Sequence, residues 1–153
     1  RKKYTTLVAL LPLISAISGN VGLQASTLTT RAISHSQVRT DNYSLWLLKE
    51  VIAAFYLGIA IGFVIASMAL YITHSFPFAL SIFIAQFIGI LTAGGTGTLA
   101  PLLFTFIFQR DSGKWGGPLE TAVQDVVGSF AMIVVTYKIM LLFHIEVEPS
   151  DMC

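Results

Sequence analysis

The chain consists of four long apolar segments joined by shorter polar ones. The apolar segments cover residues 4–33, 46–73, 78–108 and 118–143. Each is long enough to cross a bilayer as a single helix at about 1.5 Å of rise per residue. Most charged residues lie between these segments or in an acidic tail, residues 144–153. The pattern predicts an all-α integral membrane protein in which residues 1–153 form one domain with four spans.

The composition supports a membrane protein and narrows the classes of function. Hydrophobic residues make up 55% of the 153 residues and charged residues only 11%, against about 25% charged residues in a soluble domain. The net charge of +1 gives no reason to expect a nucleic-acid partner. Cys153 is the single cysteine, which excludes an internal disulfide and a thiolate metal cluster. Because the chain begins at Arg1 rather than at Met, we expect a piece of a longer or processed protein.

Asp125 is the most informative residue of the last apolar segment. It lies about two turns after Pro118, where a carboxylate is costly unless it meets water, a partner or a cation. We interpret it as facing a polar pathway for a hydrated cation, with Thr121 and Gly128 on the same helical face. The alternative is a structural ion pair with Arg31 or Lys49.

The first apolar segment carries a polar face. Asn20, Gln24, Thr27 and Arg31 follow one another at helical spacing, and lipid cannot satisfy amide side chains. We therefore expect Asn20, Gln24 and Thr27 to line a pore opposite Asp125, although hydrogen bonding between helices is an equal alternative. Pro12 and the glycines of this segment predict a kink or a break.

Small residues mark two expected helix contacts. Gly58 and Gly62 form a Gly-x-x-x-Gly motif, for which packing within the chain is favoured over a dimer contact. The segment 92–98 contains three glycines and predicts a bend or a very close helix crossing.

Two further acidic residues are candidate cation sites at the mouths of a pore. Glu50 follows Lys49 near the start of the second segment, and Asp111 lies in the loop before the fourth. For both, a solvated or loop charge is favoured over ion binding. The three histidines, His35, His74 and His144, lie at loops or segment ends and are expected at the interface rather than at a metal.

Several of these motifs together resemble one family. Residues 12–27, followed by Arg31, are similar to the second transmembrane helix of MgtE-type magnesium transporters. They read Pro-Leu-Ile-Ser-Ala-Ile-Ser-Gly-Asn-Val-Gly-Leu-Gln-Ala-Ser-Thr. Lys49-Glu50 resembles the start of that family's third helix, and residues 97–102 resemble the end of its fourth. Residues 110–125, with Gly-Pro-x-x-Thr-x-x-x-Asp, resemble the loop and start of its fifth.

The resemblance implies a five-helix MgtE-like bundle, of which this chain would hold four helices. It also implies a homodimer with a pore on its two-fold axis, where the aspartate matching Asp125 binds the permeating Mg²⁺ from both subunits. The position matching Thr121 lies beside that site. The family's first helix and cytosolic regulatory domains are absent from this chain, and Ser112 stands where the family usually has proline.

We therefore expect a transporter or channel that moves hydrated Mg²⁺ through a pore at a homodimer interface. Its partners would be the bilayer, Mg²⁺ and a second copy, with Co²⁺ as an alternative ion and no cofactor. We expect a multi-pass protein of the plasma (inner) membrane, with an organelle membrane as the alternative. The sequence has no His-Glu-x-x-His or Gly-x-Ser-x-Gly motif, so no enzyme is expected. The alternative function is a non-transporting helical subunit of a larger membrane complex.

Overall fold

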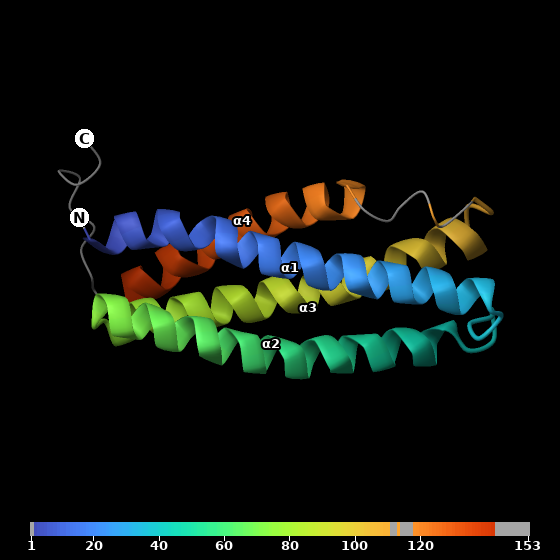
Figure 1. Ribbon diagram of the computed structural model, residues 1–153, viewed down its shortest axis with the longest axis horizontal. Coiled ribbons are helices and arrows are strands. Elements are labelled where there is room, and N and C mark those ends of the chain that lie inside the picture. Colours follow the sequence, from blue (N-terminus) through green and yellow to red (C-terminus); the bar gives the residue numbers. More distant parts are fainter. Residues whose placement is uncertain (1, 111–112, 114–117, 143–153) are drawn as a thin grey trace.

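The computed structural model describes residues 2–110, 113 and 118–142, and this part of the chain forms four helices without any strand (Figure 1). Helix α1 spans Lys2–Ser34, α2 Tyr43–Thr73, α3 Phe76–Phe106 and α4 Pro118–Leu142. All four begin and end close to the apolar segments of the sequence. The expectation of an all-α protein is confirmed for the described residues.

Helix α3 is the centre of the bundle. It packs against each of the other three helices, and α1 also packs along α4. In Figure 1, α3 lies between α2 on one side and the pair formed by α1 and α4 on the other. Helices α1 and α2 meet only sparsely, and α2 and α4 do not meet within the described residues. Only 22% of the apolar stretch of α2 is buried inside the bundle, so most of its surface is left for lipid or another helix.

Three of the helices are long and apolar enough to cross a membrane: residues Ala9–Ser34 of α1, the whole of α2 and the whole of α3. Large apolar side chains cover the outside, including Phe63 at 68% and Tyr71 at 81% exposure. Such a surface is stable in lipid and not in water. The structure thus supports a multi-pass membrane protein with three spans, whereas a fourth span through α4 and the five-helix bundle stay predictions.

The glycine motif of α2 packs against α3. A Cβ atom at Gly58 would lie 3.0 Å from Cδ2 of Phe87, and one at Gly62 would lie 3.2 Å from Cδ2 of Phe83. Both glycines are buried. The expected packing within the chain is confirmed, because the missing side chains make room for two phenylalanine rings of the neighbouring helix.

The two expected interruptions of helices have different outcomes. Helix α1 continues through Pro12 and the following glycines as far as Ser34, so a break does not occur there, and a kink stays a prediction. A helix in a tightly packed bundle tolerates the one hydrogen bond that proline removes. Helix α3 also continues through residues 92–98, and there the expected close crossing is confirmed. Gly94 contacts Cβ of Ala54 on α2, and Gly97 contacts the backbone of Gly22 on α1.

A tryptophan joins α1 to α2 near the loop that connects them. Trp46 Nε1 donates a hydrogen bond to Thr29 Oγ1 over 3.2 Å. In the loop, Asn42 Oδ1 accepts from the backbone N–H of Arg39 over 2.8 Å, and Val38 is buried against this end of the bundle. A tryptophan near a helix end is typical of the membrane interface. Glu50 follows one turn further along α2, and we therefore expect it just inside the membrane from that interface.

Candidate functional site

Asp125 lies at the contact between α4 and α1. Its carboxylate is exposed, and Oδ1 accepts a hydrogen bond of 2.6 Å from the hydroxyl of Ser15. Ser15 itself is buried, at 7% exposure. A distance this short is typical of a hydroxyl that donates to an ionised carboxylate. The structure thus gives the costly charge of α4 one strong partner from α1 and leaves the carboxylate open on its other side.

Thr121 lies one turn earlier in α4 and contacts the same part of α1. A Cβ atom at Gly19 would lie 3.5 Å from Cγ2 of Thr121. Ser15 and Gly19 are themselves one turn apart, so the two helices run antiparallel here, with Ser15 beside Asp125 and Gly19 beside Thr121. Two small residues of α1 let α4 approach closely, and this places both candidate ion-binding residues of α4 at one contact.

The other polar residues of α1 lie on a different part of the helix. Asn20, Gln24 and Thr27 are all exposed. Gln24 follows Ser15 by nine residues, which is about two and a half turns, so its side chain leaves α1 on the opposite face. Within one chain the structure therefore does not bring Gln24 to Asp125. That these three residues line a pore stays a prediction.

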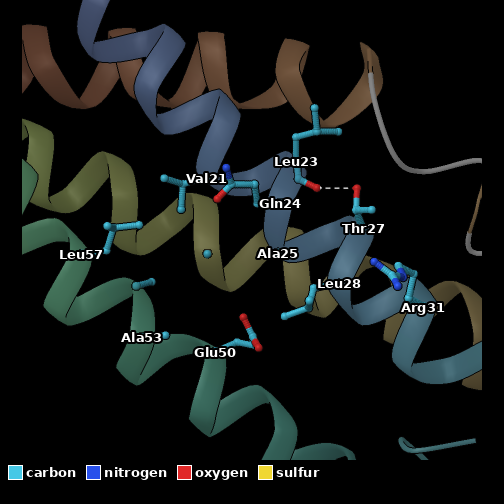
Figure 2. Close-up of a pocket in the computed structure, with 12 residues that line it drawn as sticks. Val21, Leu23, Gln24, Ala25, Thr27, Leu28, Arg31, Glu50, Ala53 and Leu57 are labelled. Atoms are coloured by element: carbon cyan, nitrogen blue, oxygen red, sulfur yellow. Dashed lines mark hydrogen bonds between the residues drawn. The ribbon is translucent and has the colours of Figure 1, made fainter. Parts of the chain in front are cut away.

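Gln24 and Thr27 instead line a groove between α1 and α2, which we call the α1–α2 groove. It has a volume of about 560 Å³, within the range of small-molecule sites. Figure 2 shows Glu50 projecting from α2 toward α1 in this groove, with Arg31 near the end of α1. Gly94 of α3 also lines it. The full lining comprises Val21, Leu23, Gln24, Ala25, Thr27, Leu28, Arg31, Glu50, Ala53, Ala54, Leu57 and Gly94.

The hydrogen bonds at the groove are mostly local. Thr27 Oγ1 donates to the carbonyl oxygen of Leu23 over 2.8 Å, as the dashed line in Figure 2 marks. Glu50 is half-buried and forms no ion pair within the described part of the chain. The structure thus places this candidate mouth residue in a groove together with Gln24 and Thr27, on the far side of α1 from Asp125.

No basic side chain neutralises Asp125 within the described residues. Arg31 lies 16 residues after Ser15 on α1, which is about 24 Å along the helix axis, and Ser15 is the residue that contacts Asp125. Lys49 belongs to α2, which does not meet α4. The alternative of a structural ion pair with either residue is therefore not supported inside one chain.

No group of three or more His, Cys, Asp or Glu side chains that could hold a metal ion occurs among the residues that the structure describes. His35 and His74 are exposed, and His74 ends α2. Gly128 belongs to α4, but its surroundings lie outside the description, as do Asp111, His144 and the acidic tail. The arrangement at Asp125 is thus a single carboxylate bonded by the hydroxyl of Ser15, which suits a cation that keeps its water shell.

The sequence did not single out Ser15 and Gly19 as neighbours of the site. Both are small, and they are one helical turn apart on the same side of the first segment. Asn20 and Gln24 are more polar, and their polarity predicted that another face of α1 would line the site. The available signal was the spacing of the small residues, because a helix that approaches closely needs small side chains beneath it.

Comparison with known protein families identifies the family of the chain. The family model of MgtE, described as a divalent cation transporter, matches residues 11–135. The match runs from the first half of α1 through both sides of the Ser15–Asp125 contact and into α4. No curated protein matches the chain. With more than half of its length matched by the family model, the chain belongs to the MgtE family of divalent cation transporters.

Proposed function

We propose that the chain moves hydrated Mg²⁺ across a membrane, through a pore beside the contact of α1 and α4. The observation that carries the proposal is the exposed carboxylate of Asp125 in the apolar helix α4, held by the hydroxyl of Ser15. Ionisable groups at membrane depth usually mark an ion pathway, because their desolvation is costly otherwise.

The chemistry of the contact favours Mg²⁺ over softer metals. Asp125, Thr121 and Ser15 offer only oxygen atoms. Mg²⁺ prefers oxygen ligands in octahedral geometry and loses its water slowly, whereas zinc and copper favour imidazole and thiolate. The exposed carboxylate of Asp125 can bind the water shell of such an ion without displacing it. Co²⁺ remains the second candidate ion.

A homodimer would complete the site. One Asp125 balances half of the charge of a divalent cation, and a second copy would supply the other half. The proposed interface includes the face of α4 that carries Thr121, Asp125 and Gly128. Val126 and Phe130 lie on the opposite side of α4 and are exposed, at 71% and 70%, so they offer apolar surface for lipid.

The driving force would be the membrane potential of the plasma (inner) membrane. Each elementary charge gains about 2.3 kcal/mol per 100 mV, so a divalent ion gains about twice that. Transport of this kind needs no covalent chemistry, which agrees with membership of a transporter family rather than with an enzyme.

The test is Mg²⁺ uptake into proteoliposomes that carry an inward-negative potential. We expect Asp125→Asn to abolish uptake, because the amide cannot balance the charge of the ion. The matched control is Asp41→Asn, which removes a carboxylate from the exposed loop between α1 and α2. Uptake by Asp125→Asn at the rate of the wild type would contradict the proposal. A wild-type chain that folds but carries no ion would favour the non-transporting subunit.

A further inference from the structure

The hydroxyl of Ser15 could donate to a backbone carbonyl oxygen one turn earlier in its own helix, but it donates elsewhere. Three helical serines among the described residues, Ser34, Ser67 and Ser81, donate back to their own helix. Ser34 donates to the carbonyl oxygen of Thr30 over 3.0 Å, and Ser67 donates to that of Phe63 over 2.7 Å. Ser15 instead donates across to Asp125, 110 residues away in the sequence. The interhelical bond is therefore preferred over the usual bond within a helix.

The bond engages only one oxygen of the carboxylate. Oδ1 accepts from Ser15, whereas Oδ2 has no hydrogen-bond partner among the described residues. Asp125 is exposed, so Oδ2 is an acceptor open to the surroundings of α4, and the water molecules of a hydrated cation are donors. The bond from Ser15 to Oδ1 thus fixes the direction in which Oδ2 points.

The backbone around the pair supports this arrangement. Gly19 allows ordinary van der Waals contact with Thr121, at 3.5 Å for an added Cβ atom. The close approach of α1 and α4 one turn away lets the short side chain of Ser15 reach the carboxylate. Ser15 is buried beneath that contact, so few other conformations compete with the bond.

We propose that Ser15 is a positioning residue of the ion site: it orients the carboxylate of Asp125 toward the water shell of the cation. The inference rests on the proposed function, in which Asp125 binds hydrated Mg²⁺. A hydrogen bond that merely joined α1 to α4 would affect stability alone, whereas positioning affects the affinity for the ion.

The experiment compares Ser15→Ala, which removes the hydroxyl, with Ser15→Thr, which retains it. The control is Ser67→Ala, an exposed serine of α2 whose hydroxyl bonds its own helix. The wild type and each variant are reconstituted for Mg²⁺ uptake, and the thermal unfolding of each is measured in detergent with and without Mg²⁺. The second readout reports binding without transport, because a ligand of the folded state raises the Tm.

We expect Ser15→Ala to raise the Mg²⁺ concentration for half-maximal uptake roughly tenfold, the effect of losing a hydrogen bond to a charged group. The maximal rate should change less. The rise in Tm that Mg²⁺ causes should shrink in Ser15→Ala, and Ser15→Thr should restore both values. Ser67→Ala should behave as the wild type.

The outcomes separate the two proposals. Uptake by Ser15→Ala with the affinity of the wild type would overturn the positioning inference and leave the proposed function intact. If the wild type shows no uptake, but Mg²⁺ raises its Tm and does not raise the Tm of Ser15→Ala, transport would be overturned and the positioning inference supported. Loss of affinity in both Ser15→Ala and Ser15→Thr, parallel to a lower Tm without Mg²⁺, would show a structural bond only. If the wild type shows no uptake and Mg²⁺ does not raise its Tm, both the proposed function and the positioning inference would be overturned.

Discussion

Gly97 of α3 lies directly against the backbone carbonyl oxygen of Gly22 of α1. An added Cβ atom would collide with backbone, which cannot rotate away. We predict that Gly97→Ala separates α1 from α3 and destabilises the bundle by about 1–3 kcal/mol, the usual cost of overpacking. The measurement is thermal unfolding in detergent.

Gly95 is the matched control for this prediction. It lies two residues away in the same helix, and an added Cβ atom would meet nothing within 4 Å. Gly95→Ala should leave the Tm unchanged or raise it, because a helix with alanine in its interior is about 0.5–1 kcal/mol more stable than one with glycine. Equal destabilisation by both substitutions would mean that helix geometry, and not the contact with Gly22, controls this site.

Gly89 and Ser18 form a second close contact between α3 and α1. An added Cβ atom at Gly89 would lie 2.7 Å from Oγ of Ser18 but 3.6 Å from its Cβ atom. We therefore predict that Gly89→Ala alone lowers the Tm, whereas Gly89→Ala with Ser18→Ala recovers much of the loss. A double-mutant cycle measures the coupling, for which contacting residues usually give about 0.5–3 kcal/mol.

Gln86 makes this cycle more informative. Its Nε2 donates to Ser18 Oγ over 3.4 Å, and both residues are fully buried. Ser18→Ala alone should therefore cost some stability through the loss of this weak bond. Additive effects of the two substitutions would contradict the contact, since independent sites add.

The helices of this protein could be predicted from the sequence, because membrane-spanning segments are defined by length and hydropathy alone. The contact of Gly58 and Gly62 could also be predicted, since a glycine pair at this spacing has few other uses in an apolar helix. The continuity of α1 through Pro12 could not, because it depends on how neighbouring helices support the freed carbonyl group.

The face of α1 that contacts α4 could not be predicted from the sequence either. Asn20, Gln24 and Thr27 are the polar residues, and polarity alone favours them as neighbours of Asp125. The structure shows that helix approach follows size as well as polarity, because Ser15 and Gly19 are the residues in contact. The rotation of one helix about its axis depends on all of its neighbours, and here α3 fixes α1 through Gly22.

Glu50 gives a prediction for the α1–α2 groove. Its carboxylate is half-buried, and no basic group pairs with it within the described residues. We predict that Glu50→Gln leaves the Tm unchanged or raises it, because a neutral amide of the same shape avoids the cost of desolvating a charge. Thermal unfolding in detergent checks this, with Asp41→Asn as the exposed control. A clearly lower Tm for Glu50→Gln would reveal a charged partner of Glu50.

Trp46 gives a prediction for the end of the bundle near the loop. Its Nε1 donates to Thr29 Oγ1 over 3.2 Å, and Thr29 is fully buried. We predict that Trp46→Phe and Thr29→Val each cost about 1 kcal/mol from the lost hydrogen bond. The double variant should cost clearly less than the sum, because the partner is then no longer left unpaired. Thermal unfolding of all three variants tests this, and a fully additive double variant would contradict the bond.

The proposed dimer can be tested at the surface of α4. Ala122 is exposed and lies one turn from Asp125, so it lies near the proposed two-fold axis. In a Cys153→Ser background, we predict that Ala122→Cys forms a disulfide between two copies in membranes under mild oxidation. A disulfide requires Cα atoms less than about 7 Å apart, which holds only close to an axis. Phe63→Cys, at another exposed position, on α2, should stay monomeric. Cross-linking of Phe63→Cys without Ala122→Cys would move the interface to α2 and leave Asp125 outside it.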